Sequence, residues 1–176
     1  MELQWERESE LALKAVSTGE EFICDRPARA SLVSKESLRD IATDVDVRVE
    51  RHMTRILAAS GHAVVGEEAF AQTPRLPAGQ APFWPVDPID GTVNLVSGMP
   101  FYALSAGLCV NDQFVAGAVS LPAFKELFFT YGDHGSYLNG ARLRSFDAEL
   151  ASSLVGASFS GIKGDPQVRR KQYEAF

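Results

Sequence analysis

The region that most constrains the fold is residues 83–131, where short apolar segments alternate with turns of a few residues. These segments are rich in Phe, Val, Leu and Tyr, and they read FWPVD, FYALSAGLCV, FVAGAVSL and KELFFTY. Connectors as short as Asn111-Asp112-Gln113 and Gly132-Asp133-His134-Gly135 favour hairpins, so consecutive strands are expected to be antiparallel neighbours. Asn139-Gly140 predicts one more hairpin before Arg142. This part of the chain therefore predicts a largely antiparallel sheet.

Two amphipathic helices are expected before these strands. Residues 2–18 place apolar side chains on one side of a helix that Gly19 is expected to end. A second helix is expected to follow Thr43, with apolar residues recurring at spacings of three and four, and to end at Gly61. The Pro-containing segment 22–36 is expected to be loop and extended chain. The fold class is therefore α+β, with two long helices packed on the sheet.

Composition excludes several classes of protein. The chain has 176 residues, of which 45% are apolar and 23% charged, as is typical of a globular domain. Its 17 basic and 23 acidic residues give a net charge of −6, so neither a nucleic acid nor an anionic membrane is the expected partner. No apolar run approaches the roughly 20 residues that span a bilayer, and the charged N-terminus does not resemble a signal peptide. We expect a cytoplasmic protein in which Cys24 and Cys109 are reduced thiols.

The candidate site lies where carboxylates follow an apolar segment. Asp87 and Asp90 belong to the sequence WPVDPIDGTVN, in which the predicted strand ends before Asp87. Pro88 restricts the backbone between the two aspartates, so both can point into one site. Gly91 permits a close backbone approach, and Gly91-Thr92-Val93 can open a helix or tight turn whose free N–H groups attract phosphate.

Further charged residues lie upstream of this stretch. Gly66-Glu67-Glu68 follows the apolar pair Val64-Val65, so it also sits at a strand end. Converging carboxylates raise one another's pKa unless a cation intervenes, and oxygen-only ligands suit a hard ion such as Mg²⁺. Together with a phosphate-binding turn, they favour metal-assisted hydrolysis or transfer at phosphorus. Lys35, Asp44 and Asp46 add a candidate phosphate partner and more acids near a helix start.

Each feature taken singly has a simpler interpretation. Asp-Pro and Asp-Gly are common in turns, Glu67-Glu68 can be a solvated turn, and Asp46 suits the first turn of a helix. Lys35 alone is typical of a surface charge, and His52 is typical of a histidine packed in a core. Only the stretch from Asp87 to Thr92 favours chemistry by itself.

Taken together, the motifs resemble those of the inositol monophosphatase family of Mg²⁺-dependent, lithium-sensitive phosphatases. WPVDPIDGTVN resembles the family's signature, with Trp84 at its usual place. Lys35 and the segment 40–46 resemble its lysine and Asp-Leu-Val-Thr-x-x-Asp segment, and Gly66-Glu67-Glu68 resembles its Gly-Glu-Glu. Further positions are similar to the segments that follow the signature: Pro100, Ser105, Gly107 and residues 135–143. The resemblance implies the layered α/β sandwich of the inositol monophosphatase and sugar phosphatase type.

The resemblance also implies a set of metal ligands. Glu67, Asp87 and the backbone carbonyl of Ile89 would hold one Mg²⁺, and Asp87 and Asp90 would share a second. Two or three ions are implied in all, and Li⁺ is expected to inhibit. The metals would stabilise the entering and leaving oxygens of an in-line displacement at phosphorus.

The same resemblance assigns the remaining site residues. Glu67 with Thr92 would position the attacking water, and Asp46 would lie close by in the same network. The backbone N–H groups of Gly91 and Thr92 would hold the ester phosphate, with Lys35 nearby. The substrate implied is a small phosphate monoester, and the assembly that the family implies is a homodimer.

The match stops short of the family's full pattern. The family continues with a second α/β half whose Trp-x-x-Asp segment completes the second metal site, and nothing after Phe159 resembles it. A strand is expected over 154–160, and Asp165-Pro166 predicts a helix that runs to the end of the chain without a stop signal. We expect a metal-binding phosphatase domain over 1–152 and the start of a truncated second domain over 153–176. Such a chain alone is expected to bind Mg²⁺ weakly and to turn over poorly or not at all, unless a partner supplies the rest.

Several functions stay open on the sequence. The first is hydrolysis of an inositol phosphate or a related sugar or polyol phosphate, and the second is a non-catalytic role as a binding or regulatory partner. A histidinol-phosphate phosphatase is a third, although relatives of that kind often carry arginine where this chain has Val93. A phosphatase with an aspartyl-phosphate nucleophile is disfavoured, because its aspartates are two apart and Asp87 and Asp90 are three apart.

Overall fold

The computed structural model describes residues 5–24, 32–37, 40–72, 77, 81–145, 149, 151 and 153. The chain divides into two compact units, residues 1–144 and 145–176, and the fold described below is that of the first. The strand and helix expected over 154–160 and after Asp165 lie outside the described residues, and the domain boundary at residue 152 stays a prediction. No helix in the described part of the chain is long and apolar enough to cross a membrane.

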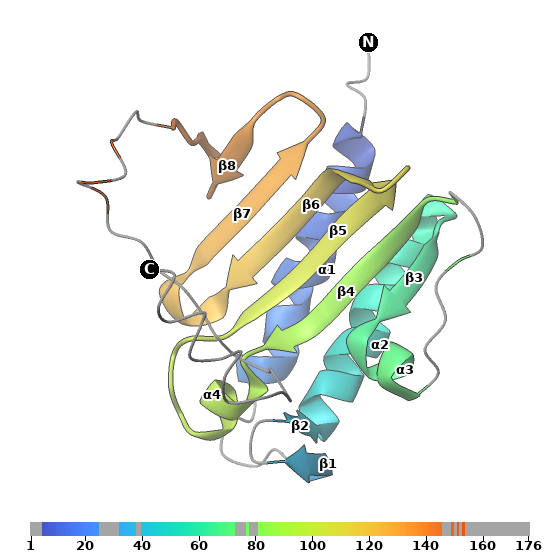
Figure 1. The fold of residues 1–176 in the computed structure, drawn as a ribbon, viewed down its shortest axis with the longest axis vertical. Helices are drawn as coiled ribbons and strands as arrows, with labels where there is room; N and C mark the ends of the chain where they lie inside the picture. Colours follow the sequence, from blue (N-terminus) through green and yellow to red (C-terminus); the bar gives the residue numbers. More distant parts are fainter. Residues whose placement is uncertain are drawn as a thin grey trace. The chain divides into compact units, whose positions relative to one another are not determined.

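Seven strands of the described residues form one sheet (Figure 1). They lie side by side in the order in which they occur along the chain, and only the first pair, β3–β4, is parallel. The strands are β3 (Ala63–Gly66), β4 (Phe83–Asp90), β5 (Ala103–Val110), β6 (Gln113–Leu121), β7 (Glu126–Tyr131), β8 (Ser136–Leu138) and β9 (Ala141–Arg142). The predicted antiparallel hairpins are confirmed.

Turn chemistry accounts for two of these hairpins. Asn111 and Asp112 join β5 to β6 with φ of 50° and 61°, and Asn139 and Gly140 join β8 to β9 with φ of 50° and 82°. Two-residue turns with positive φ at both positions match the right-handed twist of the strands, and Asn, Asp and Gly adopt such φ values most readily. The parallel pair β3–β4 instead needs a longer crossover, which contains α3 (Glu67–Gln72).

Two long helices cover one face of the sheet. Helix α1 (Glu6–Cys24) packs against β5, β6 and β7, and α2 (Asp44–Leu57) packs against β4 and α1 (Figure 1). The remaining elements are α4 (Thr92–Val96), the 3-10 turns Ala58–Ser60 and Pro122–Phe124, and a separate antiparallel pair, β1 (Leu32–Ser37) with β2 (Asp40–Thr43).

The expected end of the first helix at Gly19 is wrong. Helix α1 continues to Cys24, and Gly19 is buried within it. A Cβ atom at Gly19 would lie 2.7 Å from Leu104 Cδ2. The glycine therefore allows α1 to approach β5 closely, which is a packing role that a stop signal in the sequence does not reveal. The expected end of the second helix is confirmed, because Gly61 closes the turn that follows α2 with φ of 81°.

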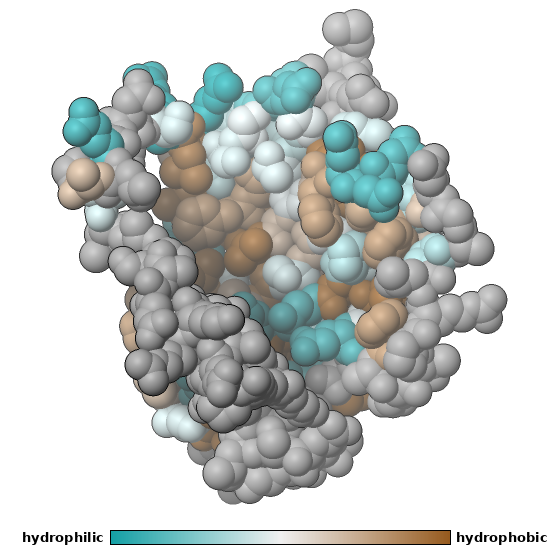
Figure 2. All heavy atoms as spheres, in the orientation of Figure 1, coloured by the Kyte–Doolittle hydropathy of each residue, from teal (hydrophilic) through white to brown (hydrophobic). Residues whose placement is uncertain are grey.

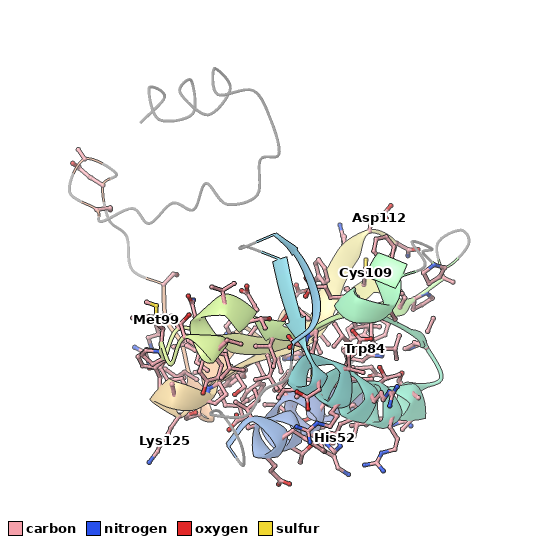
Figure 3. All side chains as sticks on the ribbon, turned by 90° about the horizontal axis from the view of Figure 1, so that it is seen from below. His52, Trp84, Met99, Cys109, Asp112 and Lys125 are labelled. Atoms are coloured by element: carbon pink, nitrogen blue, oxygen red, sulfur yellow. The ribbon has the colours of Figure 1, made fainter. Side chains whose placement is uncertain are left out.

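The core lies between these helices and the sheet. Alternate residues of β4, β5 and β6 point toward the helices and are buried, while the residues between them point to the other face. Figure 3 shows Trp84 between α2 and the sheet, where its Nε1 donates to Ser60 Oγ at 2.9 Å. The other buried apolar residues are Ala12, Ala15, Val16, Ile23, Val45, Val49, Met53, Leu57, Val86, Ile89, Leu95, Leu104, Ala106, Leu108, Ala116 and Ala118.

The second face of the sheet, turned away from α1 and α2, is hollowed and largely apolar. Phe83, Val119 and Phe128 are among the side chains that line a hollow of about 820 Å³. Figure 2 looks onto this face and shows hydrophobic residues gathered across it. Glu67 and Asp87 stand on the wall of the same hollow. The candidate site therefore opens on the second face rather than into the helix-covered core.

Candidate metal and phosphate site

The parallel pair β3–β4 brings two predicted ligands together. Gly66, the last residue of β3, is paired with Val86 in β4. Helix α3 begins at the next residue, so Glu67 lies beside Asp87, and the two carboxyl groups are hydrogen-bonded to each other. Sequence spacing placed both residues at strand ends, and the parallel pairing explains why these ends coincide.

Asp87 is the most perturbed acid of the site. Its pKa is raised from 3.8 to about 8, by burial first and then by the charge of Glu67, the hydrogen bond to Glu67 and the charge of Asp90. A backbone hydrogen bond at Ile89 acts in the opposite direction. The Oδ1 atom of Asp87 is buried and has no hydrogen-bond partner among the residues that the structure describes. This oxygen needs either a proton or a cation nearby.

The donor set fits a hard divalent cation. Glu67, Asp87, Asp90 and the carbonyl of Ile89 offer only oxygen, the ligand type that Mg²⁺ prefers. Within the described residues, no group of three or more His, Cys, Asp and Glu side chains is arranged to hold a metal ion. Mg²⁺ is commonly bound by one or two carboxylates and keeps several waters. The pair Glu67–Asp87, with its unpartnered oxygen, matches that mode of binding.

Asp46 and Thr92 form a second part of the site. Thr92 Oγ1 lies 2.8 Å from Asp46 Oδ1 and 3.0 Å from the carbonyl oxygen of Ile89, and it can donate its single proton to either. Asp46 lies in the first turn of α2 and is only 1% exposed. The side chain of Asp46 therefore helps to hold the Thr92 hydroxyl in place, and the two residues belong to one hydrogen-bond network.

The chain after Asp87 differs in one respect from the expectation. The strand was expected to end before Asp87, whereas β4 runs on to Asp90, with an irregular register between Asp87 and Asp90. Pro88 lies in this interval and has no N–H for the ladder, which accounts for the irregularity. The side chains of the two aspartates are thus positioned by an irregular strand end and not by a loop.

The expected glycine turn and helix start are confirmed. Gly91 precedes α4 with φ of 91°, and a Cβ atom there would lie 2.8 Å from the carbonyl oxygen of Phe101. Asn94 Nδ2 donates to the same oxygen at 2.6 Å. Glycine is required at this point both by the backbone conformation and by the closeness of the neighbouring chain.

Some predicted residues lie outside this description or outside the site. Lys35 is paired with Ile41 between β1 and β2, but its side chain and that of Glu68 are not among the described ones. Asp44 starts α2 and lies 4.0 Å from Arg48, as expected of a first-turn acid. His52 bonds to Thr18 Oγ1 at 2.7 Å and lies among the helices in Figure 3, as expected of a packed histidine.

One residue of this region is absent from the sequence predictions. Glu50 on α2 is 9% exposed, and its Oε1 accepts a hydrogen bond from the backbone N–H of Ala69 at 3.1 Å. The only hint of Glu50 in the sequence is its spacing of four residues from Asp46, which puts both acids on one side of the helix. Such spacing is common on solvated helices, so the sequence alone gave no reason to single out Glu50.

The sequence profile of the inositol monophosphatase family matches residues 5–175. The chain belongs to this family. The resemblance seen in the motifs is thereby confirmed.

Three relatives illustrate the extent of the similarity. Inositol monophosphatase 3 of Solanum lycopersicum is 30% identical over 162 residues, which cover 90% of this chain and 60% of that protein. A fructose-1,6-bisphosphatase/inositol-1-monophosphatase of Aquifex aeolicus is 33% identical over 119 residues, covering 66% and 44%. A staphylococcal inositol monophosphatase-1, solved as an inhibitory complex soaked in 100 mM LiCl, has a TM-score of 0.67 at 20% identity, covering 81% and 54%.

These comparisons confirm the α+β fold class. The chain spans about half the length of the curated relatives that it matches.

Proposed function

We propose that this chain serves the Mg²⁺-dependent hydrolysis of a small phosphate monoester, namely an inositol phosphate or a related sugar or polyol phosphate. The observation that carries the proposal is Asp87, whose Oδ1 is buried beside the carboxyl of Glu67 and finds no hydrogen-bond partner in the described part of the chain. Membership of the inositol monophosphatase family supports the class of reaction. The oxygen-only donor set supports the class of metal.

Glu67 and Asp87 would bind the cation, with Asp90 and the carbonyl of Ile89 as further donors. When bound, Mg²⁺ polarises phosphoryl oxygens and lowers the pKa of a coordinated water. The negative charges that raise the pKa of Asp87 are then balanced, so Asp87 is held as a carboxylate. Glu67 would also accept a proton from the attacking water, because its side chain is exposed to solvent.

The hydroxyl of Thr92 would orient the attacking water. Its proton is directed to Asp46 or to the carbonyl of Ile89, so a lone pair of Oγ1 remains to accept a hydrogen bond from water. The water oxygen attacks phosphorus as the ester P–O bond breaks, Glu67 takes the water's proton, and the leaving alcohol receives a proton from solvent. The backbone N–H groups of Gly91 and Thr92 would hold the phosphate, and Lys35 is the proposed source of a balancing positive charge.

A calorimetric titration with Mg²⁺ tests the proposal directly. The chain and its Asp112→Asn variant are expected to bind Mg²⁺, because Asp112 lies in the exposed β5–β6 turn, away from the site. The Asp87→Asn variant is expected to show no binding. Phosphate release from inositol 1-phosphate is expected to be slow at most for the chain and for Asp112→Asn, and absent for Asp87→Asn, so Mg²⁺ binding is the deciding measurement.

Two outcomes would contradict the proposal. Unchanged Mg²⁺ binding by Asp87→Asn would remove Asp87 from the metal site. Absence of Mg²⁺ binding by the unsubstituted chain would favour the alternative, a non-catalytic member of the family that acts as a binding or regulatory partner.

A further inference from the structure

The start of α3 lacks the side chain that normally caps a helix. The first N–H groups of a helix have no partner within it, and Ser, Thr, Asp or Asn before the first turn usually supplies one. Here the preceding residue is Gly66, which has no side chain. The N–H of Ala69, in the first turn of α3, donates instead to Oε1 of Glu50 at 3.1 Å. A carboxylate from α2 therefore takes the place of the missing cap.

The identity of Gly66 fits this arrangement. Gly66 is buried, and a Cβ atom placed on it would lie 2.6 Å from Glu50 Cγ and closer still to Glu50 Cδ and Oε2. Glu50 is buried on α2, and a shift of its carboxylate away from Gly66 would break its hydrogen bond to the N–H of Ala69. The glycine provides the space that the carboxylate occupies beside the junction of β3 and α3.

Two acids of α2 thus hold the two segments of the candidate site. Asp46 is bonded to Thr92 at the start of α4, and Glu50, one turn later, is bonded to Ala69 at the start of α3. Helix α3 has six residues, too few to be stable without outside contacts. The orientation of the Glu67 side chain, at the first residue of α3, therefore depends on the contacts that fix the first turn of this helix.

We propose that Glu50 is a positioning residue for the cation site: its carboxylate caps α3 across the side-chain-free Gly66 and so fixes Glu67 beside Asp87. This inference rests on the proposed function, because Glu67 is there a ligand of the cation. Glu50 itself does not bind the cation. Residues that orient a metal ligand in this way typically contribute about 10–100-fold to metal affinity.

The test combines a metal-independent and a metal-dependent measurement on the full chain. Hydrogen exchange at the Ala69 amide reports the cap, and Mn²⁺ binding, followed by the electron paramagnetic resonance of free Mn²⁺, reports the site. Glu50→Ala is expected to accelerate exchange at Ala69 and to weaken Mn²⁺ binding by about 10–100-fold. Glu50→Gln keeps an acceptor oxygen and is expected to restore most of both. Arg51→Ala, the exposed neighbour on α2, is the control and is expected to change neither.

Gly66→Ala provides a second route if Glu50→Ala does not fold. The added methyl group is expected to displace the Glu50 carboxylate and to reproduce the losses of Glu50→Ala. The two changes remove the same contact, so the double variant is expected to be no worse than the more affected single variant. Fully additive losses would overturn the proposal.

The outcomes separate this inference from the proposed function. Unchanged exchange at Ala69 in Glu50→Ala would overturn the cap, whatever the metal does. Faster exchange with unchanged Mn²⁺ affinity would overturn the link to Glu67. If the unsubstituted chain binds no Mn²⁺, the proposed function fails, the role of Glu50 in the cation site fails with it, and the exchange data decide only whether Glu50 caps α3.

Discussion

Two groups of acids in this molecule differ in how their oxygens are satisfied. On α2, Asp46 and Glu50 are buried, and each accepts a hydrogen bond from a donor of the chain itself. At the end of the β3–β4 pair, Asp87 faces Glu67 and Asp90, and none of the described residues donates a hydrogen bond to its Oδ1. Burial alone therefore does not distinguish a structural acid from a metal ligand. What distinguishes the two groups is whether hydrogen-bond donors of the described residues lie close to the carboxylate oxygens.

The largest effect expected from this comparison is at Glu67. Glu67→Gln removes one negative charge from the Glu67–Asp87 pair. It is expected to weaken Mg²⁺ binding by more than the roughly 10–100-fold expected for a residue, such as Glu50, that only orients a metal ligand. The free energy of unfolding without metal is expected not to fall, because the repulsion on Asp87 is relieved. Calorimetric titration and urea unfolding measure the two quantities. Strong destabilisation of the metal-free chain would place Glu67 with the structural acids.

At Asp46, unlike at Glu67, the main effect is expected on the stability of the metal-free chain. Asp46→Ala removes a buried carboxylate that accepts from the Thr92 hydroxyl and leaves the Ile89 carbonyl as the other acceptor. Loss of a hydrogen bond to a charged group is expected to lower the free energy of unfolding by about 1–3 kcal/mol. Asp44→Ala, at the half-exposed start of the same helix, is the matched control and is expected to cost less than Asp46→Ala. Urea unfolding of the three proteins checks this. Equal stabilities for Asp46→Ala and Asp44→Ala would break the comparison.

A further effect appears in the pH dependence of stability. The pKa of Asp87 is about 8 in the folded chain and near its ordinary 3.8 in the unfolded one, so at intermediate pH only the folded state holds this proton. The free energy of unfolding of the metal-free chain is therefore expected to fall as pH rises from about 4 to about 8. Asp87→Asn is expected to flatten this slope. Identical slopes in thermal unfolding at pH 5, 6.5 and 8 would contradict the raised pKa.

The smallest effect is expected at His52, on the same helix as the structural acids. Burial, and then the charge of Arg55, lower the pKa of His52, while Glu21 acts in the opposite direction. Stability from this group is fully present above the ordinary pKa of 6.5 and is lost as pH falls from there through the lower pKa of the folded chain, because the unfolded chain binds the proton first. His52→Gln is expected to reduce this acid sensitivity, with His62→Gln as the control. Equal acid sensitivity of both variants would contradict the assignment.

Much of the fold could be predicted from local sequence. The hairpins follow from connectors such as Asn111-Asp112-Gln113, which are too short to join strands that are not neighbours. The turn at Gly91 and the end of the second helical segment at Gly61 follow from backbone conformations that glycine adopts readily. Where a glycine instead serves a tertiary contact, local reasoning fails. Gly19 was expected to end a helix, and it is the point at which α1 meets Leu104.

The candidate site divides in the same way. The acids of the signature could be named from their spacing, because Asp87 and Asp90 lie on one short stretch. That Glu67 lies beside Asp87 depends on the parallel pairing of β3 with β4, which the sequence does not specify. Glu50 was missed because its partner, Ala69, becomes a neighbour only in the folded chain.

Proton release on Mg²⁺ binding is the most direct test of the central claim that the cation binds at Asp87. At pH 7 a carboxyl with a pKa of about 8 is largely protonated, and the cation must displace that proton. Titration calorimetry in two buffers of different ionisation enthalpy counts the protons. The expected result is release of about one proton per bound Mg²⁺ from the unsubstituted chain and from Asp112→Asn. Binding of Mg²⁺ without proton release, or equal binding and release in Asp87→Asn, would contradict it.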